Sequence, residues 1–384
     1  MDGRFKQALA EREAKGLLRR LRGIEPSRPG YVQREGRELL DLSSNDYLGL
    51  AHHPLLAARA CEWAHEFGTG ARASRLVSGT LEAHLAVERK IAAFKGSESA
   101  LLVASGWQAN ATIFPALMAL FPKAQIFTDR LIHASMHHGI AAAGVRQVRF
   151  RHNDYEHLAE LLGKRQSSDD PPLIVTESVF SMDGDRADLA RLVQIAREHG
   201  AFLIVDEAHA TGVLGPGGAG LSAALADKPD LVMGTFSKAL GGFGAYVAGS
   251  QALVDYLVNA ASGVIYSTAL PPSVLGAVDA ALELVPGMAA ERTHLAALAE
   301  RLRAGLHAKG YDTGPSDTQI VPLMVGEAEE ALAMAQAMEG RGILGIAIRP
   351  PTVPVGASRI RFALSAVHSE ADVDTVLDIV GAAA

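Results

Sequence analysis

Short apolar blocks alternate with helix-period segments through the first three quarters of the chain. The clearest block is Phe202–Val205, a run of large apolar residues that ends in the charged Asp206 and Glu207. Such a run is typical of a parallel strand that is buried on both faces. Further strands are predicted at 39–42, 100–104, 126–128, 148–151, 173–176, 231–233, 245–248, 320–325, 344–348 and 359–363. We expect the strand at 245–248 to run antiparallel or to lie at an edge.

Helical spacing of apolar residues fills most segments between these strands. Leu81, Leu85 and Ile91 recur at this spacing, so a helix is predicted over 81–95. The other predicted helices are 2–22, 108–120, 189–199, 289–309, 328–340, 370–382 and one that begins at Pro271. Strands that alternate with helices indicate an α/β fold, with a mostly parallel seven-stranded sheet covered by helices on both faces.

The pattern also divides the chain into parts. Residues 1–50 are predicted to form an N-terminal helix and arm, and residues 51–285 the large domain with the sheet. The long helix at 289–309 then leads into a smaller α+β domain, predicted over 286–384. A chain of 384 residues exceeds one usual domain, which agrees with this division.

Composition narrows the class of protein. Apolar residues make up 48% and charged residues 21%, as in a soluble globular protein, and the net charge of −7 favours neither nucleic acid nor an anionic membrane. The single cysteine, Cys61, excludes an internal disulfide and suits a reducing cytosol. The charged N-terminus resembles no signal peptide, no apolar run reaches membrane length, and no metal-ligand spacing is present. We therefore expect a cytoplasmic protein without a metal.

Two segments carry candidate chemistry. Lys238 follows the predicted strand 231–233 and lies among small residues and glycines, where a desolvated amine can form a Schiff base. Asp206 follows strand 202–205, at the sheet edge where ligands of open α/β sheets bind. Each residue alone is also compatible with a surface lysine in a glycine-rich turn or with a capping aspartate. Together they indicate a pyridoxal phosphate site, because the pyridine nitrogen of that cofactor needs a carboxylate beside it.

Other polar side chains follow neighbouring strand ends. His133, Ser181 and His209 each come shortly after a predicted strand, so they are expected on the same edge of the sheet. Ser105-Gly106-Trp107 precedes a predicted helix, whose N-terminal N–H groups would suit a phosphate. This segment lacks the P-loop and dinucleotide spacings, which disfavours nucleotide binding. His133, taken singly, is equally compatible with a hydrogen-bonded loop histidine.

Five motifs together resemble the α-oxoamine synthases, pyridoxal phosphate enzymes of fold type I. These motifs are Asn45–Leu50, Ser181–Gly184, Asp206–His209, Thr235–Lys238 and Arg349–Pro354. The resemblance extends from the N-terminal helix to the last strand. It implies an acyltransferase that condenses an amino acid with an acyl thioester and releases CO₂. The segment Ile348–Pro354 most resembles members that act in biotin biosynthesis.

The resemblance also implies roles for the cofactor site. Lys238 would hold the cofactor as a Schiff base and move the α-proton, and Asp206 would pair with the pyridinium. His209 would bond the phenolic oxygen, with Ser181 nearby, and His133 would stack on the ring. The residues implied for the phosphate are Gly106, Trp107, Thr235 and, from a partner subunit, Thr268. Family sites lie at a dimer interface, so a homodimer is expected.

Substrate contacts follow from the same resemblance. Arg361 with Asn45 would bind the amino-acid carboxylate, because a buried carboxylate requires a fixed guanidinium, and Arg359 is a weaker choice. The full set of implied substrate contacts is Arg19, Asn45, Ser74, His133, Thr352 and Arg361. Ser74 stands where glycine-using 5-aminolevulinate synthases have threonine, which leaves space for a methyl group.

The expected reaction is the condensation of L-alanine with a pimeloyl thioester of coenzyme A or of an acyl carrier protein. The alternatives are sister enzymes that use glycine, namely 2-amino-3-ketobutyrate CoA ligase and 5-aminolevulinate synthase, and more distantly an aminotransferase or a cofactor-free binding protein of this fold. Two residues depart from the pattern: Trp107 replaces a smaller aromatic residue, and Thr80 replaces a tyrosine of some members. Both changes bear on how the acyl chain fits.

Overall fold

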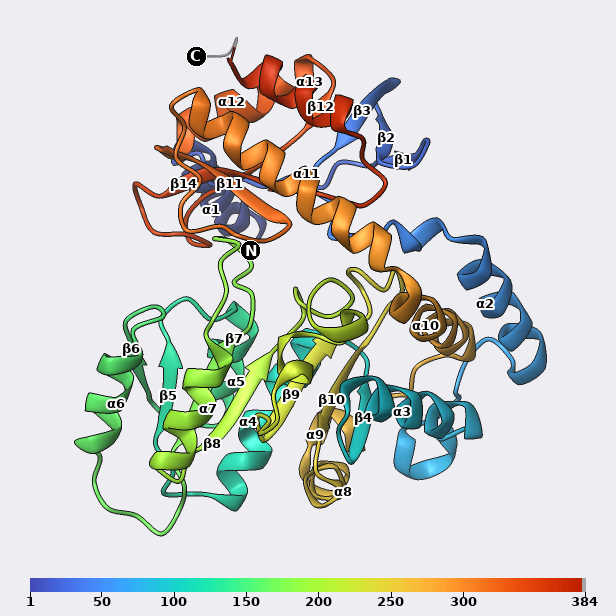
Figure 1. Ribbon diagram of the computed structural model, residues 1–384, viewed down its shortest axis with the longest axis vertical. Helices are drawn as coiled ribbons and strands as arrows, with labels where there is room; N and C mark the ends of the chain where they lie inside the picture. Colours follow the sequence, from blue (N-terminus) through green and yellow to red (C-terminus); the bar gives the residue numbers. More distant parts are fainter. Residues whose placement is uncertain (382–384) are drawn as a thin grey trace. The chain divides into compact units, whose positions relative to one another are not determined.

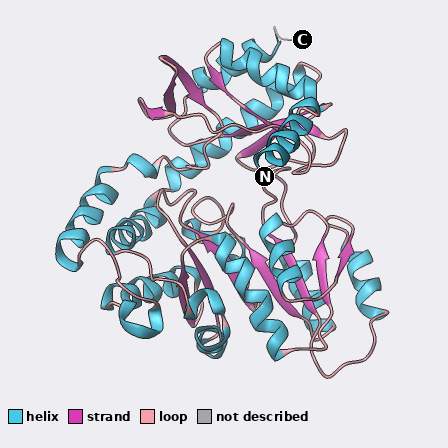
Figure 2. Ribbon diagram, turned by 180° about the vertical axis from the view of Figure 1, so that it is seen from behind, coloured by secondary structure: helices cyan, strands magenta, loops and turns pink. Residues whose placement is uncertain are grey.

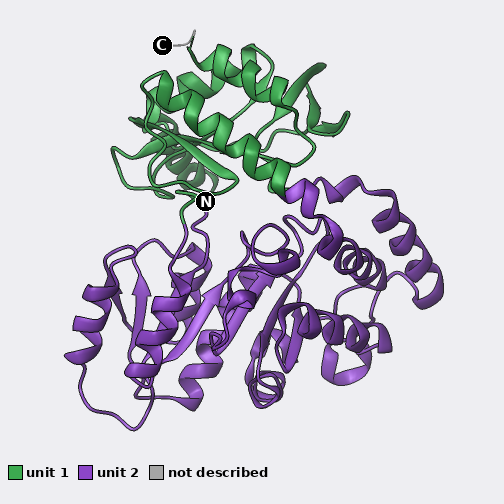
Figure 3. Ribbon diagram, in the orientation of Figure 1, with its two compact units in different colours: residues 1–47, 182–185, 293–384 green, residues 48–181, 186–292 purple. Residues whose placement is uncertain are grey.

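The computed structural model describes residues 1–381, and it divides into two compact units. Unit 1 contains residues 1–47, 182–185 and the chain from 293 onward, and unit 2 contains 48–181 and 186–292 (Figure 3). The division predicted from the sequence, an arm at 1–50 and domains at 51–285 and 286–384, stays a prediction. The last three residues of the chain, 382–384, lie outside the described residues, and residue 382 is also the last residue of the predicted helix 370–382.

Unit 2 is built on a sheet of seven strands, which confirms the predicted fold class. The strand order is β4 (Ser99–Val103), β10 (Ala245–Gly249), β9 (Leu231–Thr235), β8 (Phe202–Asp206), β7 (Leu173–Glu177), β5 (Ile126–Asp129) and β6 (Gln147–Phe150). The strands from β9 to β6 pair in parallel, whereas β10 runs antiparallel to both of its neighbours. The expectation of an antiparallel strand at 245–248 was correct, but β10 lies inside the sheet and not at its edge.

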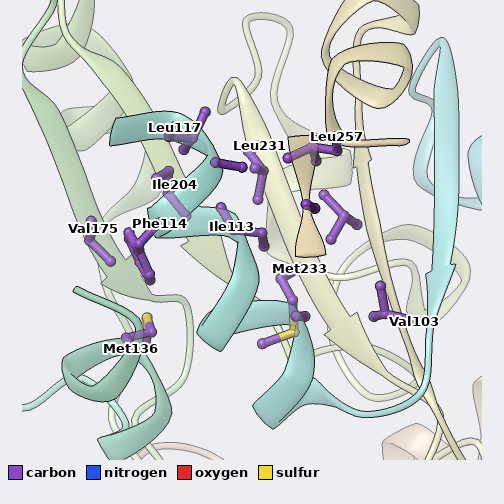
Figure 4. Close-up of a cluster of buried hydrophobic side chains, with 14 of the residues drawn as sticks. Val103, Ile113, Phe114, Leu117, Met136, Val175, Ile204, Leu231, Met233 and Leu257 are labelled. Atoms are coloured by element: carbon purple, nitrogen blue, oxygen red, sulfur yellow. The ribbon is translucent and has the colours of Figure 1, made fainter. Parts of the chain in front are cut away.

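Helices cover both faces of this sheet (Figures 1 and 2). Successive strand residues point to opposite sides, and apolar residues on both sides need cover from water. Val175 of β7 and Ile204 of β8 pack with one cluster, while Ile174 packs with the other. The first cluster also contains residues of α4 (Gly106–Leu120), α5 (Ala134–Ala142) and α8 (Gln251–Ala260) (Figure 4). The second contains residues of α6 (Tyr155–Gly163) and α7 (Leu189–Glu198).

The remaining elements of unit 2 precede or follow the sheet in the chain, except for η3 and η4, which lie between β8 and β9. They are α2 (Pro54–Phe67), α3 (Glu82–Lys95), α9 (Ser262–Ile265), α10 (Pro272–Leu284), the π-helix η2 (Arg75–Gly79) and the 3₁₀ helices η1 (Leu50–His52), η3 (Pro216–Gly218), η4 (Leu221–Ala224) and η5 (Val285–Gly287). Helix α10 packs against both α2 and α3.

Unit 1 contains two small sheets and the last helices. One sheet has the order β1 (Glu25–Pro26), β2 (Tyr31–Arg34), β3 (Arg37–Asp41), β12 (Ile343–Leu344), and the other β11 (Ile320–Gly326), β14 (Ser358–Ala363), β13 (Ile346–Ile348). Its helices are α1 (Asp2–Ala14), α12 (Ala328–Gly340), α13 (Glu370–Gly381) and all but the first turn of α11 (Ala289–Ala308). Among residues 1–381 no single helix could cross a membrane, although one bent pair, Pro272–Gly287 with Ala289–Ala308, passes by length and composition.

Two predicted elements were wrong in extent. The helix predicted over 2–22 ends at Ala14, because Gly16 adopts a left-handed conformation with φ of 62° and no residue of α1 is buried against the unit. The strand predicted over 344–348 is two short strands, β12 and β13, which belong to different sheets. Helices α2, α5, α6 and α8 were not predicted at all.

A buried ion pair ties the segment after β8 to helix α3. Lys95 is 3% exposed and Glu207 is completely buried, and Lys95 Nζ lies 2.6 Å from Glu207 Oε2. Ser222 donates to the same carboxylate through its hydroxyl at 2.6 Å and its backbone N–H at 3.0 Å. Burial alone would lower the pKa of Lys95, but the nearby Glu207 raises it above the ordinary value, which favours the ammonium form of the lysine.

We predict that Lys95→Met destabilises the protein strongly, because it leaves the Glu207 carboxylate buried without its cation. Breaking one side of a buried pair costs about 3–5 kcal/mol. The free energy of unfolding, measured with denaturant, should recover largely in Lys95→Met combined with Glu207→Met. The matched control is Lys164→Met, which removes an exposed pair with Glu160 and should change stability by about 0–1 kcal/mol. A loss in Lys95→Met no larger than in the control would contradict the interpretation.

Candidate active site

A pocket of about 210 Å³ lies at the carboxyl ends of the parallel strands of unit 2. Parallel register aligns Glu177 with Asp206, and Asp206 with Met233, so the loops after β7, β8 and β9 begin side by side. The pocket brings together seven of the nine residues predicted for the cofactor. They are Gly106, Trp107, His133, Asp206, His209, Thr235 and Lys238.

The carboxylate of Asp206 is fixed at one side of this pocket. Asp206 is 6% exposed, and its Oδ1 accepts a hydrogen bond from the backbone N–H of Ala208 at 2.9 Å. Its Oδ2 accepts a second one from Asn110 Nδ2 at 3.1 Å. A carboxylate held in this way keeps its orientation and is suited to pair with a positively charged ring nitrogen.

The N-terminus of α4 lines another part of the pocket. Ser105 caps the helix by accepting a hydrogen bond from Gln108 N. The N–H groups of the first turn, at Gly106 and Trp107, have no partner inside the helix, as at the start of any helix. Gly106 stands close to Thr235, since a Cβ on Gly106 would lie 2.8 Å from Thr235 Cγ2. The hydroxyl of Thr235 is buried and has no protein partner. N–H and O–H donors of this kind suit a phosphate.

Lys238 lies in the tight connection between β9 and β10. The connection is closed by hydrogen bonds from Gly241 N to Lys238 O at 2.9 Å and from Gly242 N to Phe236 O at 2.8 Å. The Lys238 side chain is half-buried and lines the same pocket as Asp206 and His133. A fixed backbone on both sides of the lysine therefore places its amine among the groups predicted to surround the cofactor.

His133 is the N-cap of α5 and lines the pocket through its imidazole. Burial lowers the pKa of His133, the Asp206 carboxylate opposes this shift, and the Lys238 ammonium adds to it. The ring is therefore neutral near pH 7. Trp107 meets it edge to face, with ring centroids 6.4 Å apart.

Three pocket residues were missed by sequence reasoning: Asn110, Ser135 and Glu177. Asn110 lies one helical turn after Gly106, and this i, i+4 spacing was a signal that could have identified it. Glu177 is 2% exposed and its Oε1 has no hydrogen-bond partner. Burial raises the pKa of Glu177 well above the ordinary value, and the Asp206 carboxylate raises it further.

Two residues predicted for the cofactor do not line this pocket. Ser181 is buried and follows β7, and Thr268 lies in the segment after α9. Thr268 forms an isolated antiparallel bridge with Ser74, next to a hydrogen bond from Ala269 N to Ala73 O at 3.0 Å. The predicted phosphate contact of Thr268 belongs to a partner subunit, so it stays a prediction.

The residues predicted for the substrate carboxylate meet inside unit 1. Arg361 is 7% exposed and donates from Nη2 to Asn45 Oδ1 at 3.2 Å. Tyr47, which sequence reasoning missed, is fully buried and donates to the same Asn45 oxygen at 3.0 Å. Arg359 is instead engaged by Asp183, with Nη1 at 2.6 Å from Oδ1. These contacts favour Arg361 over Arg359 for a bound carboxylate, and the role itself stays a prediction.

The two residues predicted for the acyl substrate also lie in unit 1. Arg19 is exposed and its Nη2 lies 3.5 Å from Pro350 O, two residues from the exposed Thr352. Thr80, one of the two positions that depart from the family pattern, lies in unit 2. Its hydroxyl accepts a hydrogen bond from Arg75 Nε at 3.0 Å.

The pocket of unit 2 fits pyridoxal phosphate. It combines an unpartnered buried hydroxyl and a helix N-terminus for a phosphate, a fixed carboxylate for a ring nitrogen, and a lysine amine. Within the described part of the chain, no group of three or more histidine, cysteine or acidic residues could hold a metal ion. The donor set therefore suits an organic phosphate cofactor.

Comparison with known proteins agrees with this chemistry. The model of the family described as "Aminotransferase class I and II" matches residues 37–380. The chain is 60% identical to the 8-amino-7-oxononanoate synthase of Gluconacetobacter diazotrophicus, over 98% of this chain and 96% of the relative. It is 48% identical to the enzyme of the same name from Anaeromyxobacter dehalogenans, over 95% and 91% of the two chains.

Solved structures of similar proteins extend the agreement to the fold. A serine palmitoyltransferase from S. paucimobilis with a bound PLP–myriocin aldimine superposes with a TM-score of 0.91 at 31% identity, covering 99% of this chain and 97% of the other. The 8-amino-7-oxononanoate synthase of Francisella tularensis superposes with a TM-score of 0.77 at 26% identity, over 90% and 97%. The chain belongs to the aminotransferase class I and II family, as a pyridoxal-phosphate-dependent acyltransferase whose relatives are 8-amino-7-oxononanoate synthases.

Proposed function

We propose that the protein condenses L-alanine with a pimeloyl thioester to give 8-amino-7-oxononanoate, CO₂ and free thiol, in biotin biosynthesis. The observation that carries this proposal is the 60% identity to a synthase of that name over nearly the whole of both chains. The pocket of unit 2 supports it, because its donors suit the cofactor that this chemistry needs. We further propose that the protein works in the cytoplasm as a homodimer, with Thr268 reaching the phosphate of the partner's site.

Bound pyridoxal phosphate would supply an electron sink for charge at the α-carbon of the amino acid. Asp206 would keep the proton on the ring nitrogen, since its carboxylate is held by Ala208 and Asn110. Lys238 Nζ would remove the α-proton of alanine and later return it. His133 would lie against the ring, with His209 and Ser181 near its phenolic oxygen.

Residues of unit 1 would bind the substrates. Arg361 and Asn45 are already joined by a hydrogen bond, so the guanidinium is oriented before a carboxylate arrives. A fixed guanidinium binds a carboxylate with two parallel hydrogen bonds. Arg19 and Thr352 would contact the acyl substrate, whose carrier is coenzyme A or an acyl carrier protein.

Ser74 would decide between alanine and glycine. Its backbone is fixed by the bridge to Thr268, so a larger side chain at this position cannot move away freely. Serine is smaller than threonine by one methyl group, and this difference would leave room for the methyl group of alanine. A sister enzyme that uses glycine would need no room for a methyl group at this position.

We predict that release of free thiol is fastest with L-alanine and pimeloyl-CoA or the pimeloyl acyl carrier protein, with one CO₂ formed per thiol. The assay compares kcat/KM for L-alanine, glycine and L-serine with pimeloyl and palmitoyl thioesters. A preference for glycine would favour a sister enzyme, and a preference for serine with the long acyl chain a serine palmitoyltransferase. In Ser74→Thr, alanine alone should lose about 10- to 200-fold in kcat/KM. An unchanged alanine-to-glycine ratio would remove only the role of Ser74.

We predict that Asp206→Asn retains the cofactor but loses most turnover, because an amide does not hold the ring nitrogen protonated. Removing one side of a buried charge pair costs about 3–5 kcal/mol. If this cost is added to the activation free energy, kcat should fall by more than about a hundredfold. Cofactor absorbance after gel filtration measures retention. The matched control is Asp227→Asn, which removes an exposed partner of Arg197. Turnover within about tenfold of the wild type would show that Asp206 has a structural role only.

A further inference from the structure

A chain of hydrogen bonds joins Asp206 to His133 through Asn110 and Ser135, and the proposed roles give neither residue a part in orienting His133. Asn110 Nδ2 lies 3.1 Å from Asp206 Oδ2 and 3.0 Å from Ser135 Oγ. Ser135 Oγ lies 2.7 Å from His133 Nδ1. Asn110 is 2% exposed and Ser135 1% exposed, so water does not compete for the bonds from Asn110 to Asp206 and Ser135, whereas the bond from Ser135 to the exposed His133 is only partly buried.

The chemistry of the groups fixes the direction of each bond. A carboxylate only accepts, so the Asn110 group that faces Asp206 is the NH₂ and not the carbonyl oxygen. The same NH₂ therefore donates to Ser135 Oγ. A serine hydroxyl has one proton, and with its oxygen accepting from Asn110 that proton is directed to His133 Nδ1.

A second donor reaches the same nitrogen. The backbone N–H of Ser135 lies 3.2 Å from His133 Nδ1, where the histidine caps helix α5. Because a backbone N–H never accepts, Nδ1 carries no proton. In a neutral imidazole the proton is then on Nε2. Burial supports the neutral form, since it lowers the pKa of His133 more than the Asp206 carboxylate raises it.

The two helices that carry this chain are held close together. A Cβ on Gly139 of α5 would collide with the backbone oxygen of Asn110 in α4, so only glycine permits the approach. Phe114 and Met136 of the same helices pack in one cluster (Figure 4). The distance between Asn110 and Ser135 is therefore set by packing and not by the hydrogen bond alone.

We propose that Asn110 and Ser135 are positioning residues that couple His133 to Asp206 and hold His133 as its Nε2–H tautomer. The proposal rests on the proposed function, in which His133 lies against the cofactor ring and contacts substrate. Nε2–H is then a fixed donor toward an oxygen of the substrate, and Nδ1 is withdrawn from the chemistry. The same amide orients the Asp206 carboxylate, so one residue sets both groups.

The test measures the tautomer directly in the holoenzyme. Protein with ¹⁵N-labelled histidine is examined by NMR near neutral pH, and His133→Asn identifies the two ring signals. We expect a protonated Nε2 and an unprotonated Nδ1 in the wild type. Ser135→Ala and Asn110→Leu should each shift these signals part of the way toward a mixture of tautomers, because the shorter bond from the Ser135 hydroxyl is lost or misdirected while the backbone N–H of residue 135 at 3.2 Å remains. Ser135→Ala should also lower kcat/KM by about three- to tenfold, as expected for a lost neutral hydrogen bond, and Asn110→Leu should lower it by more than about tenfold, because that variant also removes a bond to a carboxylate.

Thr112→Val is the matched control, because Thr112 lies on the same helix and its hydroxyl bonds only backbone oxygens of that helix. It should leave the His133 signals and kcat/KM unchanged. A wild-type ring protonated at Nδ1, or unchanged His133 signals in folded Ser135→Ala and Asn110→Leu, would overturn the proposal. If both variants fail to fold, the wild-type tautomer still decides. An absence of alanine condensation by the wild type would overturn the proposed function and leave the tautomer result standing.

Discussion

The parallel pairing of β5, β7, β8 and β9 is the constraint on which the site depends. Parallel strands end at the same edge of a sheet, so the loops that follow them meet there whatever their separation in the chain. Register places Glu177 beside Asp206, and the connection after β9 brings Lys238 to the same pocket. The helices on both faces bury the strands, and the N-terminus of α4 also lines the pocket.

The carboxyl groups near this edge have different surroundings. Asp206 accepts hydrogen bonds from two donors, whereas Glu177 lies beside it with one unpartnered oxygen. Burial and the neighbouring Asp206 carboxylate raise the pKa of Glu177, so a negative charge on Glu177 is disfavoured. Glu207, the next residue after Asp206, faces Lys95 instead and serves the fold.

Much of this arrangement could be predicted from sequence, because strand and helix periods are local. The seven strands, the edge that carries His133, Asp206 and Lys238, and the cofactor followed from apolar runs that end in polar residues. Helical spacing from Gly106 could have identified Asn110 as a pocket residue, but its bond to Ser135 could not be predicted, since it arises from the contact of α4 with α5, and α5 was not predicted. The early end of α1 was also missed. The helical spacing of apolar residues continues past Gly16, whereas the backbone at Gly16 is left-handed and no longer helical. Tyr47 escaped notice because its contact with Arg361 joins residues that are distant in sequence.

The central claim is that Lys238 is the lysine that carries the cofactor. The direct measurement is reduction of the purified holoprotein with borohydride, followed by identification of the modified peptide by mass spectrometry. The account predicts a visible absorbance band that borohydride abolishes, with the reduced cofactor attached to Lys238. A label on another lysine, such as Lys95 or Lys228, would contradict the assignment of the site, and so would a protein with no such band.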